Sequence, residues 1–99
     1  MVQIRWTLIA KNDLKDISDY ISKDSTKYAK LQIIRIKHRT QIVKQQIRVG
    51  KPVPEFQNEK IRELLEERYR IIYKIISEEQ VDILTVHHSS RDLSKRRIK

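Results

Sequence analysis

Two of the three histidines of this chain stand side by side in the segment TVHHSSR, residues 85–91, where an apolar run gives way to a basic end. Imidazole titrates near neutral pH and moves protons, and arginine binds phosphate through paired hydrogen bonds. Cleavage of RNA by transesterification needs a base for the 2′-hydroxyl, a cation beside the phosphorane and an acid for the leaving oxygen. His88, Arg70 and Arg91 have suitable side chains and form one candidate catalytic set.

The position of His88 relative to Arg70 depends on how the strands that carry them pair. Side chains alternate along a strand, so His88 is expected on the same face as Val86 and Leu84. If the two strands are neighbours, a guanidinium and an imidazole would meet near one rim of the sheet. The alternative is a hydrogen-bonded strand-end histidine with no catalytic role, and residue types alone do not choose between the two.

Metal binding is not expected at the histidine doublet. Adjacent side chains on a strand point to opposite faces, so His87 and His88 cannot readily chelate one ion, and His38 lies far along the chain. The acidic residues at 13, 16 and 19 lie among lysines, and those at 66–67 and 78–79 fall in predicted turns, which is typical of solvated charges. We therefore expect neither a metal nor a cofactor.

The stretch between Asp24 and Glu55 contains no acidic residue and eight basic ones. They are Lys27, Lys30, Arg35, Lys37, Arg39, Lys44, Arg48 and Lys51. Lys30, Lys37 and Lys44 recur every seven residues, which predicts that they stack along one helical face. This face is either a docking surface for an acidic partner or a phosphate backbone, or a solvated surface that keeps the chain soluble.

The whole chain is strongly basic, with a formal net charge of +9 over 99 residues. Such a charge favours a polyanionic partner, and Lys60, Arg62 and Arg68, beside the predicted strands, are candidates for contact with nucleic acid or another target. The length allows a single domain, residues 1–99, in which residues 91–99 form a basic tail. Because no cysteine and no long apolar segment occur, we expect a cytoplasmic protein that does not enter a membrane.

Apolar periodicity predicts one strand and two helices in the first half of the chain. Residues 2–6 alternate apolar and polar side chains, as a half-buried strand does. A helical stripe follows Thr7, a possible N-cap, and ends near Lys23.

The second helix is expected to begin after Asp24 or Ser25 and to continue until Gly50 and Pro52 stop it. Its apolar stripe consists of Ala29, Ile33, Ile36, Thr40, Val43 and Ile47. The short connection between the two helices predicts an antiparallel helical hairpin.

The only glycine and both prolines fall in the connector GKPVP, residues 50–54, which leads from the helices to a sheet. Residues 61–65, 69–76 and 81–88 are rich in β-branched side chains and predict a three-stranded antiparallel meander, with the first strand added to it. Residues 60–76 also fit a helical stripe, but YRIIYKII favours a strand. The expected fold is α+β with the order β-α-α-β-β-β.

These elements and residues resemble the RelE/ParE superfamily of toxins from bacterial type II toxin–antitoxin systems, often called plasmid-stabilisation toxins. The resemblance extends over most of the chain, from Trp6 to Leu93. It rests on Trp6, Ala10, Asp13, Leu14, Ile17, Tyr20, Ile21, GKPVPE at 50–55, IREL at 61–64, YRIIY at 69–73, VDILTV at 81–86, His88 and RDL at 91–93.

The resemblance implies a growth-inhibiting toxin that a cognate acidic antitoxin neutralises in a hetero-oligomer. RelE-like members cut messenger RNA on the ribosome, and ParE-like members poison DNA gyrase. Arg70 matches an arginine that binds phosphate in the nucleases and is also found in ParE-like members, and His88 matches a position where some nucleases place a catalytic histidine. The C-terminal tyrosine of RelE has no counterpart in SKRRIK, residues 94–99.

Three hypotheses follow from this resemblance and from the charge. The first is a ParE-like toxin that acts on gyrase and is not an enzyme. The second is a ribosome-dependent endoribonuclease that uses His88, Arg70 and Arg91, and the third is a nucleic-acid-binding module outside the toxins. Lys30, Lys37 and Lys44 are the residues expected to steer the antitoxin.

Overall fold

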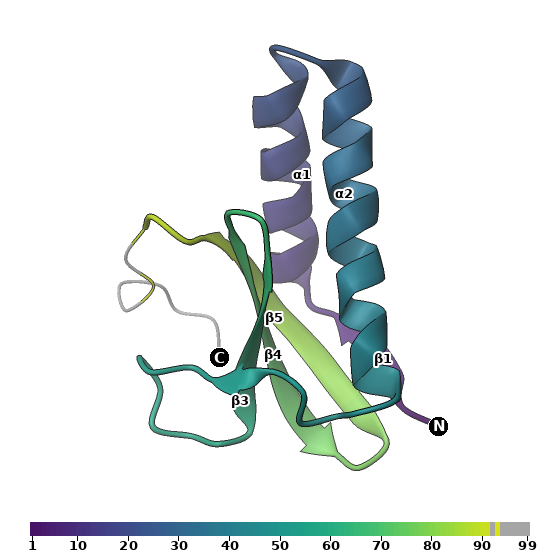
Figure 1. Cartoon of the computed structure of the whole chain (residues 1–99), viewed down its shortest axis with the longest axis vertical. Helices are drawn as coiled ribbons and strands as arrows, with labels where there is room; N and C mark the ends of the chain where they lie inside the picture. Colours follow the sequence, from purple (N-terminus) through teal and green to yellow (C-terminus); the bar gives the residue numbers. More distant parts are fainter. Residues whose placement is uncertain (92, 94–99) are drawn as a thin grey trace.

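The computed structural model describes residues 1–91 and 93 and has an α+β fold with two helices and a five-stranded mixed sheet (Figure 1). The elements, in chain order, are β1 (Gln3–Trp6), α1 (Leu8–Ser22), α2 (Thr26–Thr40), the short 3₁₀ helix η1 (Gln41–Lys44), β2 (Lys51–Pro52), β3 (Ile61–Glu66), β4 (Tyr69–Ser77) and β5 (Gln80–His88). The predicted strands and helices are present at nearly the expected bounds, with two exceptions. The second helix ends earlier than predicted, and the short strand β2 was not predicted. The predicted basic tail lies outside the described residues, apart from positions 91 and 93.

The strand order in the sheet is β1-β5-β4-β3-β2. Strands β3, β4 and β5 form the predicted antiparallel meander, and β1 adds to it by pairing with β5 in parallel. The two-residue strand β2, which pairs with β3 at the sheet edge, was not predicted. Its residues lie in the connector, where Pro52 and neighbouring Pro54 hide a strand signal.

The two helices begin where the sequence predicts, because each has a hydroxyl side chain at its N-cap. The hydroxyl of Thr7 accepts a hydrogen bond from the backbone N–H of Ala10, and the hydroxyl of Ser25 accepts one from Tyr28. Helices α1 and α2 lie side by side as a hairpin whose closed end projects beyond the sheet (Figure 1).

The second helix ends at Thr40, so the prediction that it continues to Gly50 was wrong. Residues 41–44 tighten into η1, and Lys44 therefore does not lie on the α-helical face that carries Lys30 and Lys37. The hydroxyl of Thr40 bonds the carbonyl of Lys37, an interaction that competes with the regular helical pattern.

A buried tyrosine holds the segment that follows η1 against the sheet. Tyr73, with no exposed surface, accepts a hydrogen bond from the backbone N–H of Gly50 at 3.0 Å and donates one to the carbonyl of Ile47 at 2.9 Å. A Cβ at position 50 would lie 2.6 Å from the carbonyl oxygen of Glu63. Glycine is therefore required by close packing, and these contacts override the helical periodicity of residues 41–47.

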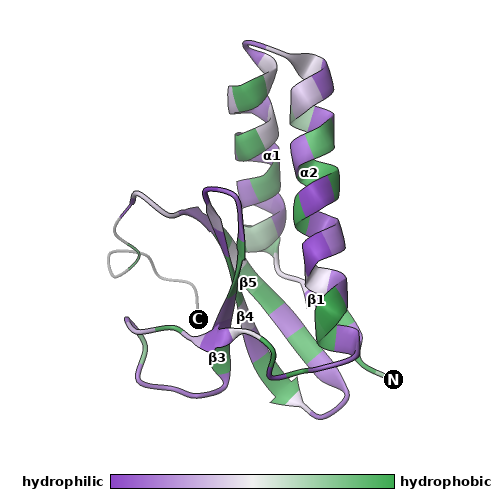
Figure 2. Cartoon of the chain, viewed as in Figure 1, coloured by the Kyte–Doolittle hydropathy of each residue, from purple (hydrophilic) through white to green (hydrophobic). Residues whose placement is uncertain are grey.

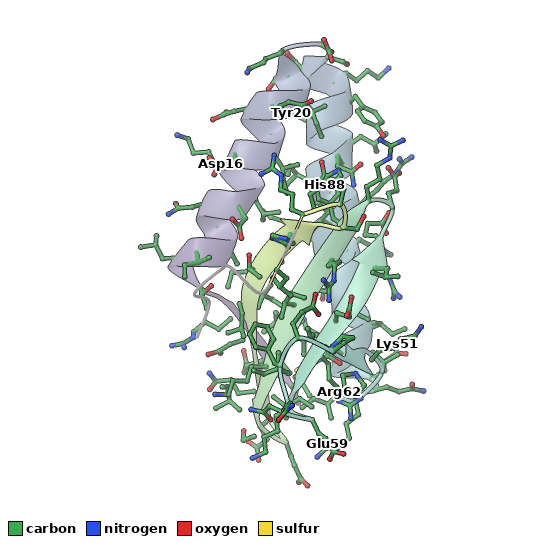
Figure 3. The ribbon with its side chains drawn as sticks, turned by 90° about the vertical axis from the view of Figure 1, so that its left-hand side faces the viewer. Asp16, Tyr20, Lys51, Glu59, Arg62 and His88 are labelled. Atoms are coloured by element: carbon green, nitrogen blue, oxygen red, sulfur yellow. The ribbon has the colours of Figure 1, made fainter. Side chains whose placement is uncertain are left out.

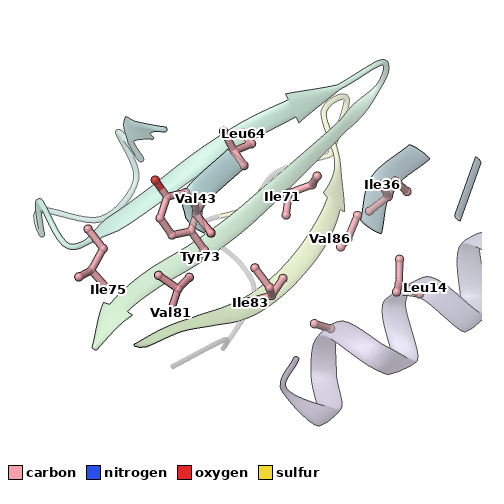
Figure 4. Packing of buried hydrophobic residues seen from close by; sticks show 11 residues of the cluster. Leu14, Ile36, Val43, Leu64, Ile71, Tyr73, Ile75, Val81, Ile83 and Val86 are labelled. Carbon is pink, nitrogen blue, oxygen red and sulfur yellow. The ribbon is translucent and has the colours of Figure 1, made fainter. Parts of the chain in front are cut away.

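The main core lies between the helices and one face of the sheet (Figure 4). Its buried members are Ala10, Leu14, Ile36, Val43, Leu64, Ile71, Tyr73, Ile75, Val81, Ile83 and Val86. A second, smaller core covers the opposite face of the sheet and consists of Val53, Ile61, Ile72, Leu84 and Leu93. Figure 2 shows the corresponding alternation of hydrophobic and hydrophilic residues along the helices and along β5. No helix in the described part of the chain is long and apolar enough to cross a membrane.

A bulge in β5 changes which side chains share a face. Ile72 pairs with Thr85 whereas the next residue, Tyr73, pairs with Ile83, so β5 contains one extra residue at this point. Leu84 consequently lies in the second core and Val86 in the main core. The expectation that His88 shares a face with both Val86 and Leu84 was therefore wrong for Leu84.

Asp13 of α1 binds this bulge. One carboxylate oxygen of Asp13 accepts a hydrogen bond from the hydroxyl of Thr85 and another, at 3.0 Å, from the backbone N–H of Val86. The interpretation of this acidic residue as a solvated helix charge was wrong, although Asp16 and Asp19 are exposed as expected. A carboxylate on the inner side of α1 thus satisfies polar groups that the irregular ladder leaves without a strand partner.

Candidate functional site

The strand pairing separates the two histidines of the doublet and changes which of them lies beside Arg70. Tyr69 pairs with His88, and Arg70 pairs with His87. The imidazole that lies across from the guanidinium is thus His87, and the predicted meeting of Arg70 with His88 does not occur. Arg70 and His88 lie on opposite faces of the sheet, since they belong to adjacent cross-strand pairs.

His88 lies at the end of β5 on the face that the helices cover (Figure 3). Its ring meets the ring of Tyr69 edge to face, with 5.5 Å between centroids and an angle of 87° between planes. Its Nδ1 accepts a hydrogen bond from the backbone N–H of Ser90 at 3.2 Å and lies 2.6 Å from the Ser90 hydroxyl. Because a backbone N–H can only donate, Nδ1 of His88 is the acceptor in the contact with Ser90.

The guanidinium of Arg70 is held between two carboxylates. It donates to Glu63 through Nε and Nη2, both at 2.9 Å, and to Glu55 through Nη1 and Nη2, both at 2.8 Å. The Arg70 side chain is only 12% exposed. Two bidentate ion pairs occupy the donors that a phosphate would need.

These ion pairs also change the ionisation of the partners. Hydrogen bonds from Arg70 lower the pKa of Glu55 to about 2, because they favour the charged carboxylate. The hydrogen bonds to Glu55 and Glu63 raise the pKa of Arg70 above its ordinary value. The three side chains join the connector to β3 and β4 as one ion-pair network.

The remaining candidate cations do not converge on Arg70 or His88. Lys60 precedes β3 and Arg68 follows it, so they lie at opposite ends of a six-residue strand, about 20 Å apart. Arg62 donates to the backbone carbonyls of Arg48 and Gly50, and Figure 3 places it at the end of the sheet remote from His88. Arg62 is thus engaged in holding the connector.

Arg91 is exposed just after β5, where its backbone N–H donates to the carbonyl of His88 and its own carbonyl contacts the ring of His87. Arg91 follows His88 closely in the chain, but His88 and Arg70 lie on opposite faces of the sheet. The predicted catalytic set of His88, Arg70 and Arg91 is consequently not brought together around one phosphate position. In the described residues there is also no cluster of three side chains able to hold a metal ion.

The basic face of α2 is a separate feature. Lys30 and Lys37 are exposed on the helix, and Lys44 is exposed on η1. In the described part of the chain none of these three lysines is within ion-pair distance of a carboxylate. The arrangement presents a one-signed surface, which can attract anionic groups of a partner.

Sequence reasoning missed the carboxylate partners of Arg70. Glu55 lies just after the connector, in a turn that brings it close to β4. The hydrophobic periodicity of the sequence does not predict the path of such a turn. Glu63 could have been found, because it lies diagonally across from Arg70 on the same face once Leu65 pairs with Arg70. His87, considered in the sequence only as half of a metal pair, is 4% exposed and lies directly across from Arg70.

Comparison with known proteins agrees with this geometry. A family model, the ParE toxin of the type II toxin–antitoxin system parDE, matches residues 4–93. A solved structure described as the chromosomal ParDE TA system from P. aeruginosa matches with a TM-score of 0.73 and 22% identity, over 89% of this chain and 96% of that one. No curated protein sequence matches significantly.

A two-helix hairpin therefore packs on a five-stranded mixed sheet, and the guanidinium of Arg70 is paired with two carboxylates on the face opposite His88. The chain belongs to the ParE toxin family of type II toxin–antitoxin systems, as the extent of the family match shows. This membership implies an antitoxin partner, and it confirms the resemblance to the RelE/ParE superfamily.

Proposed function

We propose that this chain is a toxin that stops growth by acting on DNA gyrase, in the cytoplasm, and that a cognate acidic antitoxin neutralises it in a hetero-oligomeric complex. A role in plasmid stabilisation is the expected consequence for a plasmid-borne copy. The observation that carries the choice of target is the state of Arg70. Its donors are occupied by Glu55 and Glu63, and His88 is on the other face of the sheet.

The competing hypothesis of an mRNA endonuclease requires a base, a phosphate-binding cation and an acid at one place. Arg70 is paired with two carboxylates, and His88 lies on the opposite face of the sheet, so the two are not brought to one phosphate. The geometry therefore supports the gyrase target, and family membership favours a toxin over a plain nucleic-acid-binding module.

The target is tested by induced expression in a bacterial host, followed by measurement of plasmid supercoiling, gyrase-dependent DNA breaks and transcript integrity. We expect altered topology or trapped breaks and intact transcripts. Purified toxin should inhibit supercoiling by purified gyrase, and His88→Ala should inhibit it equally. Cleaved transcripts with normal plasmid topology would instead establish the nuclease.

The antitoxin part is tested by co-expression of the toxin with the small acidic protein encoded beside it. We expect a stable complex that restores growth. Absence of any such complex, with toxicity intact, would refute neutralisation by an acidic antitoxin without affecting the choice of target.

A further inference from the structure

A cavity of about 320 Å³ lies at one end of the second core, on the face of the sheet that the helices do not cover. Its lining includes Ile61 and Leu84, two buried members of that core. Ile76 also lines it and is 45% exposed, so the cavity opens to solvent beside an aliphatic side chain. Its volume is at the lower end of the range for pockets that bind ligands, which begins at about 300 Å³.

The exposure of Ile76 follows from an irregularity in β4. Ile75 pairs with Val81 and Ser77 pairs with Gln80, so Ile76 is an extra residue without a partner on β5. Bulged residues of this kind re-aim a side chain and are frequent beside functional sites. The strand pairing thus leaves an aliphatic group of β4 exposed at the cavity.

A row of three charged residues crosses the same face of the sheet at the cavity. Arg5 of β1 pairs with Asp82 of β5, and Asp82 pairs on its other side with Lys74 of β4. Cross-strand partners point to the same face and neighbouring strands lie about 4.8 Å apart, so the two cations are about 10 Å from each other. Because two cations flank a single carboxylate, the row has an excess of positive charge.

The charged groups at the cavity leave donors free and acceptors occupied. Asp82 is 5% exposed, and each of its oxygens already accepts a hydrogen bond, one from Arg5 at 2.6 Å and one from Gln80 at 2.9 Å. Arg5 uses only its Nη2 in this contact, and its side chain is 67% exposed. Lys74 forms no ion pair within the described residues. A ligand at this cavity must therefore supply acceptors, and anionic ones are favoured.

We propose that this cavity, here called the target pocket and defined by Arg5, Lys74 and Ile76, is where the toxin docks on gyrase. It takes an apolar side chain, flanked by carboxylates, from an acidic segment of the target protein. The inference rests on the proposed function and adds to it the contact surface and the chemistry of the segment. The apolar side chain enters the cavity beside Ile76, and the carboxylates bind the free donors of Arg5 and Lys74.

Two other occupants fit the target pocket less well. A phosphate backbone would bind the two cations, but it would leave the aliphatic lining of the cavity without an apolar contact. A second copy of this chain would cover Ile76, but a symmetric interface would bring the like cations of the two copies together. An acidic segment with an apolar side chain satisfies both the lining and the donors.

Because the chain has no cysteine, a single introduced thiol gives a direct footprint of the contact. Ile76→Cys places the thiol at the target pocket, and Ile34→Cys, at a residue 62% exposed on α2, is the matched control. The rate of maleimide labelling of each toxin variant is measured alone and with purified gyrase in excess. We expect gyrase to slow labelling at position 76 by about tenfold or more and to change labelling at position 34 by less than about twofold.

Several outcomes would overturn the proposal. Labelling of Ile76→Cys at its free rate, while the same variant inhibits supercoiling by gyrase, refutes the target pocket and leaves gyrase as the target. Protection of position 76 by a DNA duplex without gyrase assigns the surface to nucleic acid, and protection that increases with toxin concentration alone assigns it to a second copy. If the unaltered toxin neither binds gyrase nor inhibits supercoiling, the proposed function itself fails, and this inference falls with it.

A charge reversal tests the cations of the target pocket separately. Lys74→Glu is expected to raise by about tenfold the toxin concentration that half-inhibits supercoiling, because carboxylates would then face a carboxylate. Lys11→Glu makes the same change in net charge at an exposed position of α1 and is the control. Urea unfolding of both variants verifies that they fold. Equal weakening of inhibition by the two variants would show that net charge, and not the target pocket, determines binding to gyrase.

Discussion

Arg70, a candidate for binding phosphate, instead forms ion pairs within the fold. It donates four hydrogen bonds to the carboxylates of Glu55 and Glu63, which come from the connector and from β3. The ion pairs fix the loop over the second core, where Val53 is buried. A guanidinium in this state contributes to the shape of the surface and does not attract a phosphate.

The first prediction concerns Glu55. Its pKa of about 2 in the folded chain is below the ordinary value of 4.5, so the charged form stabilises the fold. This stabilisation is complete above about pH 4.5 and is lost as the pH falls toward 2. Glu55→Gln should lower the free energy of unfolding at neutral pH by about 1–2 kcal/mol and flatten its fall below pH 4.5, measured by urea unfolding across the pH range.

Glu59→Gln is the matched control, because Glu59 is exposed in the same loop region and forms no ion pair within the described residues. It should leave the acid limb of the stability curve unchanged. If both variants flatten that limb equally, the effect belongs to net charge and the Arg70 ion pairs are not its cause.

A second prediction concerns the hydroxyl of Tyr73. Burial raises the pKa of Tyr73, so the group stays protonated and donates to Ile47 while accepting from Gly50. Tyr73→Phe leaves a buried N–H and a carbonyl without their partner and should destabilise the chain by about 1–3 kcal/mol in urea unfolding. Tyr20→Phe, at an exposed position, should change stability by less than about 0.5 kcal/mol, and similar losses for both would contradict the role given to Tyr73.

At the scale of elements, α1 is joined to β5 through Thr7 and Asp13. The Thr7 hydroxyl donates to the carbonyl of Leu84, the extra residue of the bulge, and Asp13 binds Thr85 and Val86 just after it. The contacts fix the helix over the irregular part of the strand. Because of the bulge, the side chain of Val86 lies on the face of the sheet that the helices cover.

The third prediction follows from this connection. Asp13→Ala removes the acceptor of the Val86 N–H and of the Thr85 hydroxyl and should lower the free energy of unfolding by about 1–3 kcal/mol. Asp16→Ala, on the exposed side of the same helix, should cost less than about 0.5 kcal/mol. Chemical denaturation measures both, and a smaller loss for Asp13→Ala than for Asp16→Ala would exclude the proposed contact with the bulge.

The elements that the sequence predicts well are those with strong local signals. Thr7 and Ser25 cap helices as expected, and YRIIYKII forms a strand because β-branched side chains outweigh the helical stripe around it. The end of α2 was missed, since the hydroxyl of Tyr73 and the close contact at Gly50 act across the fold. Periodicity describes one segment at a time and contains no such contact.

The site was predicted less well for a related reason. Arg70 was predicted as a phosphate-binding candidate, but its partners in the structure are carboxylates from a loop and from a neighbouring strand. The bulge at Leu84 shifts side chains between faces, and a rule of strict alternation cannot anticipate it. The exposure of Lys30 and Lys37, which depends only on helical spacing, was predicted correctly.

At the scale of the whole molecule, the net charge of +9 is concentrated by the acid-free segment between Asp24 and Glu55. The exposed lysines of α2 and η1 should therefore attract an acidic antitoxin before any contact forms. This electrostatic attraction increases the rate of association, whereas apolar contacts in an interface act mainly on the lifetime of the complex.

The fourth prediction is that association with the antitoxin slows as salt increases from low to physiological ionic strength, because ions screen charges beyond about 8–10 Å. Replacing Lys30, Lys37 and Lys44 by glutamine should slow association at low salt by several-fold and reduce its salt dependence, measured by stopped-flow mixing. Replacing Lys11, Lys15 and Lys74 by glutamine removes the same charge elsewhere and should have a smaller effect. If the rate of the unaltered toxin is insensitive to salt, electrostatic steering does not operate, and the cations of α2 can contribute only to the complex once formed.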